Sequence, residues 1–281
     1  AVGSTIKTIG LPYFKKLKIA VPSIDEQTRI AQILSTWDKS IEKLESLIAA
    51  KQKRKKALMQ QLLTGKKRFA GFEKPWKKEK LGDIFSKITN GLTYDTDAMT
   101  GLPVTRIETI STGKINYAKV GWAPTEENTI RFALQRGDIL YSHINSLKHV
   151  GRVAIYCAEQ PLYHGMNLLL LRANEKVVPE FIFHILNSKV GKKYAKSYAK
   201  SAVNQASIST TDVKSFKINI PEIKEQQKIA SVFASADKEI ETNQKQLFVL
   251  KQQKKGLMQQ LLTGKKRVKI DESEQMTAVG A

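Results

Sequence analysis

Residues 58–68 have the sequence LMQQLLTGKKR, and residues 257–267 repeat it letter for letter. This identity belongs to a longer repeat, because residues 9–68 align with residues 208–267 without a gap, at a constant offset of 199. Such a duplication on both sides of one unrelated segment indicates a chain with pseudo-two-fold symmetry. Symmetry of that kind is suited to contact with a duplex.

Each copy of the repeat carries the pattern of one long helix. The copies begin with PSIDEQTRIA at Pro22 and PEIKEQQKIA at Pro221, and apolar residues then recur at alternating steps of four and three. This spacing over about five heptads predicts a coiled coil. The predicted seam consists of Ile30, Leu34, Trp37, Ile41, Leu44, Leu58, Leu62, Ile229, Phe233, Ile240, Leu247, Leu257 and Leu261. Because both helices belong to one chain, we expect an antiparallel pair; homodimerisation through the same seams is the alternative.

Local signals indicate where these helices begin and end. Ser23 lies three residues before a glutamate, as in a capping box. Gly65 and Gly264 follow the last apolar positions, as expected for left-handed caps at the helix C-termini. Before each helix, an alternating run at 17–21 or 216–220 ends at a proline, which predicts a short strand.

The segment between the two copies has a different composition, in which strand-like runs alternate with turn signals. Apolar or alternating runs predict strands at 104–110, 137–142, 151–156 and 167–172, and a one-sided apolar pattern predicts a helix at 179–188. The predicted fold class is therefore α+β: one domain with a curved β-sheet, flanked by two long helices that form an antiparallel coiled coil.

The balance of charge narrows the class of partner. The 281 residues carry a formal net charge of +21, which favours a polyanion such as nucleic acid or an acidic membrane face; a lysine-rich soluble surface is the alternative. The single cysteine, Cys157, excludes an intramolecular disulfide framework and fits a reducing compartment. No apolar run approaches the roughly 18 residues of a spanning helix, so we expect a cytoplasmic protein without membrane contact.

No motif in the sequence predicts catalysis. The TGKK segments at 64–67 and 263–266 lack the upstream glycine and the Ser/Thr of a phosphate loop. The four histidines show no metal-ligand spacing, and no glycine-rich turn between a strand and a helix would hold a nucleotide. We therefore expect no catalytic residue, metal or cofactor in this chain.

A polar loop in the middle segment is the best candidate for binding. Residues 137–152, GDILYSHINSLKHVGR, place polar side chains between two strand-like runs. Asn can pair with adenine and Arg or Lys with guanine, while Ser and His contact bases or phosphates; an ordinary polar hairpin is the alternative. The candidate DNA-binding residues are Thr93, Tyr94, Arg106, Ser142, His143, Asn145, Ser146, Lys148, His149, Arg152, Asn204 and Gln205. The basic helices could also lie along phosphates or face an acidic partner.

The duplicated motifs resemble those of the specificity (S) subunits of type I restriction-modification systems. The resemblance rests on Pro-x-Ile-x-Glu-Gln-x-x-Ile-Ala at Pro22 and Pro221, on Leu-Met-Gln-Gln-Leu-Leu-Thr-Gly at Leu58 and Leu257, and on Gly-Asp-Ile-Leu at Gly137. It covers nearly the whole chain. In this family, two target recognition domains lie at opposite ends of an antiparallel coiled coil, and each reads half of a split DNA target.

The resemblance implies a DNA-reading subunit without catalytic activity of its own. The implied partners are double-stranded DNA, two methyltransferase (M) subunits and a restriction (R) subunit. S-adenosylmethionine is then expected in the methyltransferase partner, and ATP and Mg in the motor-nuclease partner. The helices would set the distance between the two half-sites and provide the docking surface for the M subunits.

The sequence departs from the family pattern because it holds one complete recognition domain. The expected division is 1–22 as the tail of a preceding recognition domain, 23–68 as the first conserved helix, 69–221 as the target recognition domain, 222–267 as the second conserved helix and 268–281 as a C-terminal tail. Either the first domain lies outside this sequence, or the chain pairs with a second half-specificity subunit. The rival interpretations are a basic coiled-coil scaffold and a nonspecific nucleic-acid-binding protein.

Overall fold

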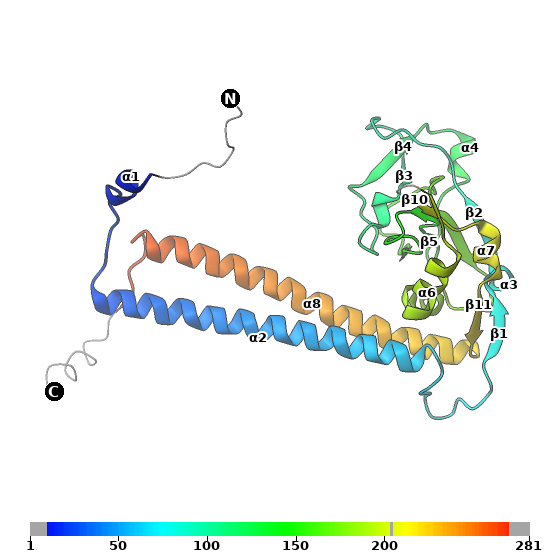
Figure 1. Ribbon diagram of the computed structural model, residues 1–281, viewed down its shortest axis with the longest axis horizontal. Coiled ribbons are helices and arrows are strands. Elements are labelled where there is room, and N and C mark those ends of the chain that lie inside the picture. Colours follow the sequence, from blue (N-terminus) through cyan, green and yellow to red (C-terminus); the bar gives the residue numbers. More distant parts are fainter. Residues whose placement is uncertain (1–9, 203–204, 270–281) are drawn as a thin grey trace. The chain divides into compact units, whose positions relative to one another are not determined.

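The computed structural model describes residues 10–202 and 205–269 and divides into two compact units (Figure 1). We call Ala1–Gln52 together with Glu239–Ala281 the helical unit, and Lys53–Lys238 the mixed unit. Two long helices, α2 (Ile24–Leu62) and α8 (Ile223–Leu262), each contribute to both units. The α+β fold class and the two long helices predicted from the sequence are confirmed.

The long helices run antiparallel within the helical unit. Lys251 on α8 lies 2.6 Å from the carboxylate of Glu45 on α2, and Lys51 on α2 lies 3.1 Å from that of Glu239 on α8. Residue numbers therefore rise along one helix while they fall along the other. One short helix, α1 (Leu11–Lys15), precedes α2.

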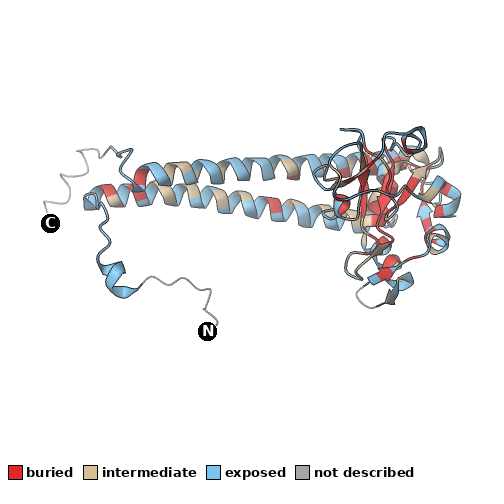
Figure 2. Ribbon diagram, turned by 90° about the horizontal axis from the view of Figure 1, so that it is seen from above, coloured by how far each residue is buried: buried red, intermediate tan, exposed pale blue. Residues whose placement is uncertain are grey.

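The predicted seam positions on both helices are buried or half-buried, and most of the positions between them are exposed (Figure 2). In the helical unit, Ile30 and Leu261 are 6% and 5% exposed. Four seam positions are polar: Lys51, Lys55, Asn243 and Lys254. They bond to the facing helix: Lys51 donates to the side-chain oxygen of Asn243 at 3.3 Å, Lys55 to Asp237 and Lys254 to Asp38. These pairings fix the register of the two helices.

The ends of the long helices have the predicted caps. The backbone N–H of Glu26 donates to Oγ of Ser23 at 3.3 Å. Gly65 and Gly264 have φ angles of +69° and +72°, in the left-handed region where glycine is favoured. The repeated sequence thus produces the same local structure at both C-terminal ends.

The centre of the mixed unit is a four-stranded antiparallel sheet. Its strands, in spatial order, are β2 (Phe85–Asn90), β8 (Leu169–Ala173), β5 (Ile139–Tyr141) and β7 (Val153–Ile155). The last three correspond to runs that the sequence predicts as strands. The helix α5 (Pro179–Asn187) is also where the sequence predicts it.

Three smaller sheets and several short helices complete the mixed unit. The sheets pair β3 (Leu102–Thr105) with β4 (Val120–Ala123), β1 (Lys77–Lys80) with β11 (Lys217–Ile220), and β10 (Gln205–Ser207) with both β6 (Ile144–Asn145) and β9 (Lys200–Ala202). The remaining helices are α3 (Leu81–Ile84), η1 (Glu108–Ile110), α4 (Glu127–Ile130), α6 (Lys189–Tyr198) and α7 (Thr210–Ser215).

The core of the mixed unit joins the sheet to the ends of the long helices. Phe181 of α5 and Phe233 of α8 are both fully buried in the same apolar cluster as Leu171 of β8. The ring of Phe233 lies 4.7 Å from that of His184, which projects from α5. Burial of these side chains fixes this part of α8 against α5 and the central sheet of the mixed unit.

The strand predicted at 17–21 does not form, although its repeat counterpart does. The counterpart β11 (Lys217–Ile220) pairs antiparallel with β1, with Lys77 opposite Ile220. Within the described residues, no strand pairs with 17–21, and a single strand has no partner for its backbone hydrogen bonds. The prediction was wrong because the alternating pattern specifies a strand that needs a neighbour.

Candidate nucleic-acid interface

The loop between β5 and β7 is closed by backbone hydrogen bonds at its base. The N–H of Ser142 donates to the carbonyl of Arg152, and the N–H of Gly151 donates to the carbonyl of Ser142, both at 2.8 Å. Gly151 has a φ of +77°, which L residues other than glycine rarely adopt. The sequence therefore produces a closed loop at 142–152, which we call the recognition loop.

Polar side chains inside the recognition loop bond to one another. Nδ2 of Asn145 donates to Oγ of Ser142 at 3.1 Å, and Oγ of Ser146 lies 3.1 Å from Nδ1 of His149. Lys148 between them is exposed. The structure thus brings these candidates together in one loop. Lys148 is exposed to solvent there, and Asn145, Ser146 and His149 are half-buried.

Two candidates in the recognition loop are buried. Ser142 is 0% and His143 6% exposed, and Nδ2 of Asn90 lies 3.2 Å from Nε2 of His143. Burial lowers the pKa of His143 to about 4, so the ring is neutral near pH 7. Both side chains therefore pack inside the mixed unit, at the start of the loop, and are not exposed on its surface. Sequence analysis grouped them with the surface residues because polar residues are usually exposed.

A second segment reaches the recognition loop through a small sheet. Ala206 of β10 pairs with Asn145 of β6, and the exposed Gln205 immediately precedes Ala206. The candidate Asn204 lies outside the described residues. The structure therefore places Gln205 beside the loop, although about 60 residues separate them in the sequence.

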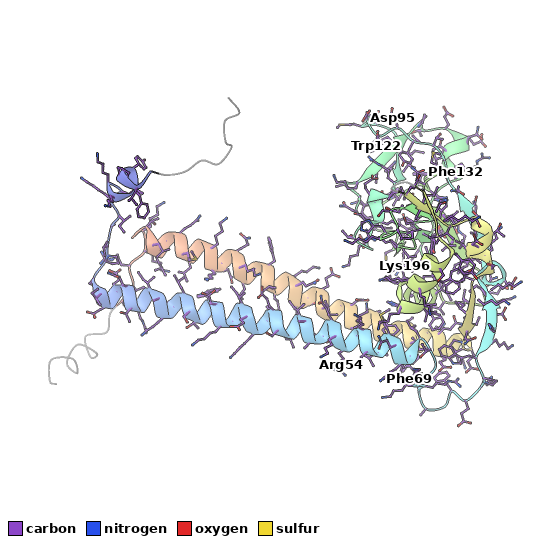
Figure 3. The ribbon with its side chains drawn as sticks, in the orientation of Figure 1. Arg54, Phe69, Asp95, Trp122, Phe132 and Lys196 are labelled. Atoms are coloured by element: carbon purple, nitrogen blue, oxygen red, sulfur yellow. The ribbon has the colours of Figure 1, made fainter. Side chains whose placement is uncertain are left out.

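Thr93 and Tyr94 line a different feature, an open pocket of about 460 Å³ that also includes Asp95 and Trp122. The hydroxyl of Tyr94 accepts a hydrogen bond from Nδ2 of Asn167 at 2.8 Å. Figure 3 shows Asp95 and Trp122 close together at one end of the mixed unit. Sequence analysis missed Trp122, a half-buried aromatic side chain of the type on which nucleic-acid bases stack.

Arg106 and Arg152 meet at the turn formed by η1. The N–H of Arg106 donates to Oγ1 of Thr109 at 2.8 Å, and its Nε lies 3.3 Å from the exposed carboxylate of Glu108. Arg152 donates through Nη1 to the carbonyl of Ser111, the residue that follows η1. The two arginines, both half-buried, are thereby connected through one short helical turn.

The Gly-Asp-Ile-Leu motif has a structural role. Asp138 is 1% exposed and accepts two hydrogen bonds from the guanidinium of Arg172 on β8, at 2.8 and 2.7 Å. This pairing raises the pKa of Arg172 further above its usual value. Gly137 before it has a φ of +91°, which needs glycine. The motif therefore fixes the start of β5, the strand that leads into the recognition loop.

Helix α6 is the main basic element that sequence analysis did not single out. Its sequence, KVGKKYAKSY, contains Lys189, Lys192, Lys193 and Lys196 and no carboxylate. All four lysines are exposed, and Lys196 is labelled in Figure 3. The K-x-x-K-K-x-x-K spacing was the available signal, because residues three and four apart lie on one face of a helix.

The described residues contain no group of three or more His, Cys, Asp or Glu side chains arranged to hold a metal ion. Within the same residues, no helix combines the length and apolar character needed to cross a membrane. The candidate residues of the recognition loop carry hydrogen-bonding and basic groups, which are the groups that contact nucleic acids in proteins.

Comparison with known proteins assigns the family. The family model described as "Type I restriction modification DNA specificity domain" matches residues 1–52 and 73–252. The chain belongs to this family. The match includes parts of both copies of the repeat as well as the mixed unit, and it confirms the resemblance carried by the duplicated motifs.

Individual relatives in this family support the assignment. A protein assigned provisionally as the MjaX specificity subunit of Methanocaldococcus jannaschii is 44% identical over 193 residues, covering 67% of this chain and 45% of the relative. The EcoKI specificity subunit of Escherichia coli K12 is 26% identical over 255 residues, covering 84% of this chain and 55% of the relative. This chain therefore spans about half the length of these two relatives.

The same fold is present among solved structures. The S subunit of a type I restriction-modification system from M. genitalium has a TM-score of 0.59 at 20% identity, with 92% of this chain and 67% of that chain covered. The HsdS subunit of Thermoanaerobacter tengcongensis has a TM-score of 0.51 at 18% identity, with 94% and 65% covered. At these identities the likeness establishes the fold alone.

Proposed function

We propose that this chain is the DNA sequence-specificity component of a type I restriction-modification complex and that its mixed unit reads one half-site of a bipartite target. The observation that carries the proposal is the family match over residues 1–52 and 73–252, which include most of the mixed unit and most of both long helices. The recognition loop supports it, because a closed loop with internal hydrogen bonds holds polar side chains in fixed positions for base contacts. The net charge of +21 favours duplex DNA as the partner.

The proposed contacts follow from exposure. Lys148 and Gln205 are the exposed polar members of the recognition loop and its neighbouring hairpin, with solvent access for a base edge. His149 and Arg106 are half-buried candidates, Arg106 for guanine. Ser142 and His143 are assigned to support of the loop. Asn145 and Ser146 orient their neighbours through the hydrogen bonds described above, and Thr93 and Tyr94 belong to the separate pocket with Trp122.

The long helices are proposed to dock two methyltransferase subunits and to separate two half-sites, with a restriction subunit completing the complex that cleaves. Catalysis, S-adenosylmethionine, ATP and Mg belong to those partners in this proposal. Continuous helices of 39 and 40 residues, about 60 Å at 1.5 Å per residue, are suited to a spacer.

Residues 11–21 are proposed to be the C-terminal part of a second recognition domain. Helix α1 has the same position in the repeat as α7, which belongs to the mixed unit. Phe14, Leu17, Ile19 and Val21 are between 49% and 80% exposed, whereas their repeat counterparts are buried in the mixed unit; these are Val213, Phe216, Ile218 and Ile220. A second recognition domain, in the same polypeptide or on a half-specificity subunit, would bury these four apolar side chains.

A map of adenine methylation in host DNA tests the proposal. Cells containing the methyltransferase subunit are compared with and without this chain, and with Lys148→Gln in the recognition loop and Lys176→Gln, an exposed lysine in a different turn, as a matched control. Methylation at one split motif that depends on the chain, is altered by K148Q and is unchanged by K176Q is the expected result. A symmetric repeat of one half-site would indicate a paired half-subunit.

An unchanged methylation map on removal of the chain would contradict the proposal. The rival interpretations, a basic coiled-coil scaffold and a sequence-independent nucleic-acid-binding protein, then become the working models. They differ in binding to random-sequence duplex, which the scaffold would lack.

A further inference from the structure

Three basic side chains from three separate elements form a group in which two of them repel the third, Lys192. They are Lys192 on α6, Arg152 at the end of the loop and Lys56 near the end of α2, and all three belong to the mixed unit. Each comes from a different part of the sequence, so the fold and not a local charge run assembles them.

Close packing of α6 on the loop brings two of these residues together. A Cβ atom added at Gly151 would lie 2.3 Å from Cβ of Ala195, which is fully buried on α6. Arg152 directly follows Gly151, and Lys192 lies one helical turn before Ala195 on the same face of α6. The missing side chain of Gly151 therefore allows α6 to approach the loop and places Lys192 next to Arg152.

The positive charges of Arg152 and Lys56 both act on Lys192. Within the described part of the chain, Lys56, Arg152 and Lys192 take part in none of the ion pairs. Partial burial lowers the pKa of Lys192, and the positive charges of Arg152 and Lys56 lower it further. The fold holds these charges together at an energetic cost, and an anion between them would remove that cost.

We propose that Lys192, Arg152 and Lys56 form a phosphate-binding cluster that seats one strand of the DNA backbone beside the recognition loop. A guanidinium has five N–H donors, so the bond from Arg152 to the Ser111 carbonyl orients the group and leaves donors for a phosphate. The cluster fixes the position of the duplex, and the neighbouring loop then reads its bases. Lys192 is a positioning residue that contributes affinity on every sequence.

This inference rests on the proposed function, since it assigns a role within the DNA interface of the same subunit. The test measures binding of the full chain to two duplexes of equal length, one with the motif from the methylation map and one with that motif scrambled. The variants are Lys192→Gln, Lys192→Arg as the conservative replacement, and Lys176→Gln as the control from the same unit. Affinities are measured between about 50 and 200 mM salt.

K192Q should weaken binding to both duplexes by the same factor. For one lost phosphate contact, the slope of log affinity against log salt should fall by about 0.9, so the deficit relative to wild type shrinks about 3.5-fold between about 50 and 200 mM salt. K192R should keep the wild-type slope, and K176Q should match wild type. The melting temperature of free K192Q should equal or exceed that of wild type, because removing Lys192 relieves repulsion.

Two outcomes separate this inference from the proposed function. If wild type prefers the target duplex but K192Q keeps the wild-type affinity and slope, the phosphate cluster is wrong and the specificity function stands. If wild type binds both duplexes equally while K192Q lowers the slope, the cluster stands and base reading is refuted. A loss confined to the target duplex, a lower melting temperature of K192Q, or a wild-type chain that binds neither duplex would also overturn the inference.

Discussion

The pseudo-symmetry of the chain allows one position to be tested in two environments. Phe233 on α8 is fully buried between the long helices and α5, while Leu34, its counterpart 199 residues earlier, is half-buried in the helical unit. Replacing a fully buried Phe by Ala removes the transfer free energy of the ring and leaves a cavity, which together cost about 3–5 kcal/mol. Leu34→Ala removes a smaller and partly exposed side chain, so we expect about 1 kcal/mol.

Urea titration of both variants, followed by far-UV circular dichroism, measures the two free energies of unfolding. The titration of His184 provides a local readout, because its ring lies 4.7 Å from that of Phe233 and burial lowers its pKa to about 4. In F233A the cavity admits water, and this pKa should rise towards the ordinary value of 6.5. Phe233→Leu, which installs the residue of the other copy, should cost about 1 kcal/mol.

Equal losses of stability in F233A and L34A would refute the reasoning, because they would show that Phe233 gains no stability from its contacts with α5 and the apolar cluster of the mixed unit. A loss below about 1 kcal/mol in F233A, with His184 still titrating near 4, would refute it in a second way.

Three further substitutions test other parts of the structure. Burial lowers the pKa of His184 from 6.5 to about 4, so stability is complete above pH 6.5, where the ring is neutral in both states, and this residue removes about 3 kcal/mol as the pH falls towards 4. Because burial lowers the pKa of His143 equally, His184→Phe should reduce the loss over this range in a pH series of urea titrations by about that amount and leave the rest. Gly151→Ala should cost at least about 2 kcal/mol of unfolding free energy, from its positive φ and its clash with Ala195; Gly71→Ala, at φ +86° in open space, should cost less, and equal losses would contradict the close contact. Arg106→Gln should weaken target binding by about 1–3 kcal/mol in competition assays while leaving random duplex unaffected, and equal weakening on both would mark a phosphate contact instead.

The sequence predicted the long helices well because their signals are local or strictly periodic. Seam spacing, the Ser23 cap and the left-handed Gly65 and Gly264 all depend on residues within a few positions of one another. Strand β1, with the sequence KKEK, has no apolar alternation and exists because β11 supplies its hydrogen bonds. Its position could not be predicted from local pattern.

The candidate interface was predicted less completely, for a related reason. Polarity placed Ser142 and His143 on the surface, but the closure of the recognition loop and its contact with Asn90 bury both. Lys192 was missed because its significance depends on Gly151, which is 41 residues earlier in the chain and allows α6 to approach. Burial and clustering are properties of the tertiary structure, and a single sequence shows them poorly.

Two ion pairs, each between the segment after one long helix and the first turn of the other, explain why the two copies share particular residues. Arg68 pairs with Glu225 in the mixed unit, and Arg267 pairs with Glu26 in the helical unit; each pair joins one copy of the motif to the other at equivalent positions. Because each residue serves in an antiparallel pairing with the opposite copy, both copies must carry the same arginine and the same glutamate.

Burial of these equivalent pairs nevertheless differs. The side chain of Arg68 is 22% exposed and that of Arg267 is 71% exposed, and Leu63 is 8% exposed where its counterpart Leu262 is 59% exposed. The ion pairing is the same in both units, so the difference in exposure arises from the strands and short helices of the mixed unit, which cover one set of residues. The repeated residues thus encode the helix pair, and the mixed unit covers one set of them; the proposed second recognition domain would cover the other set.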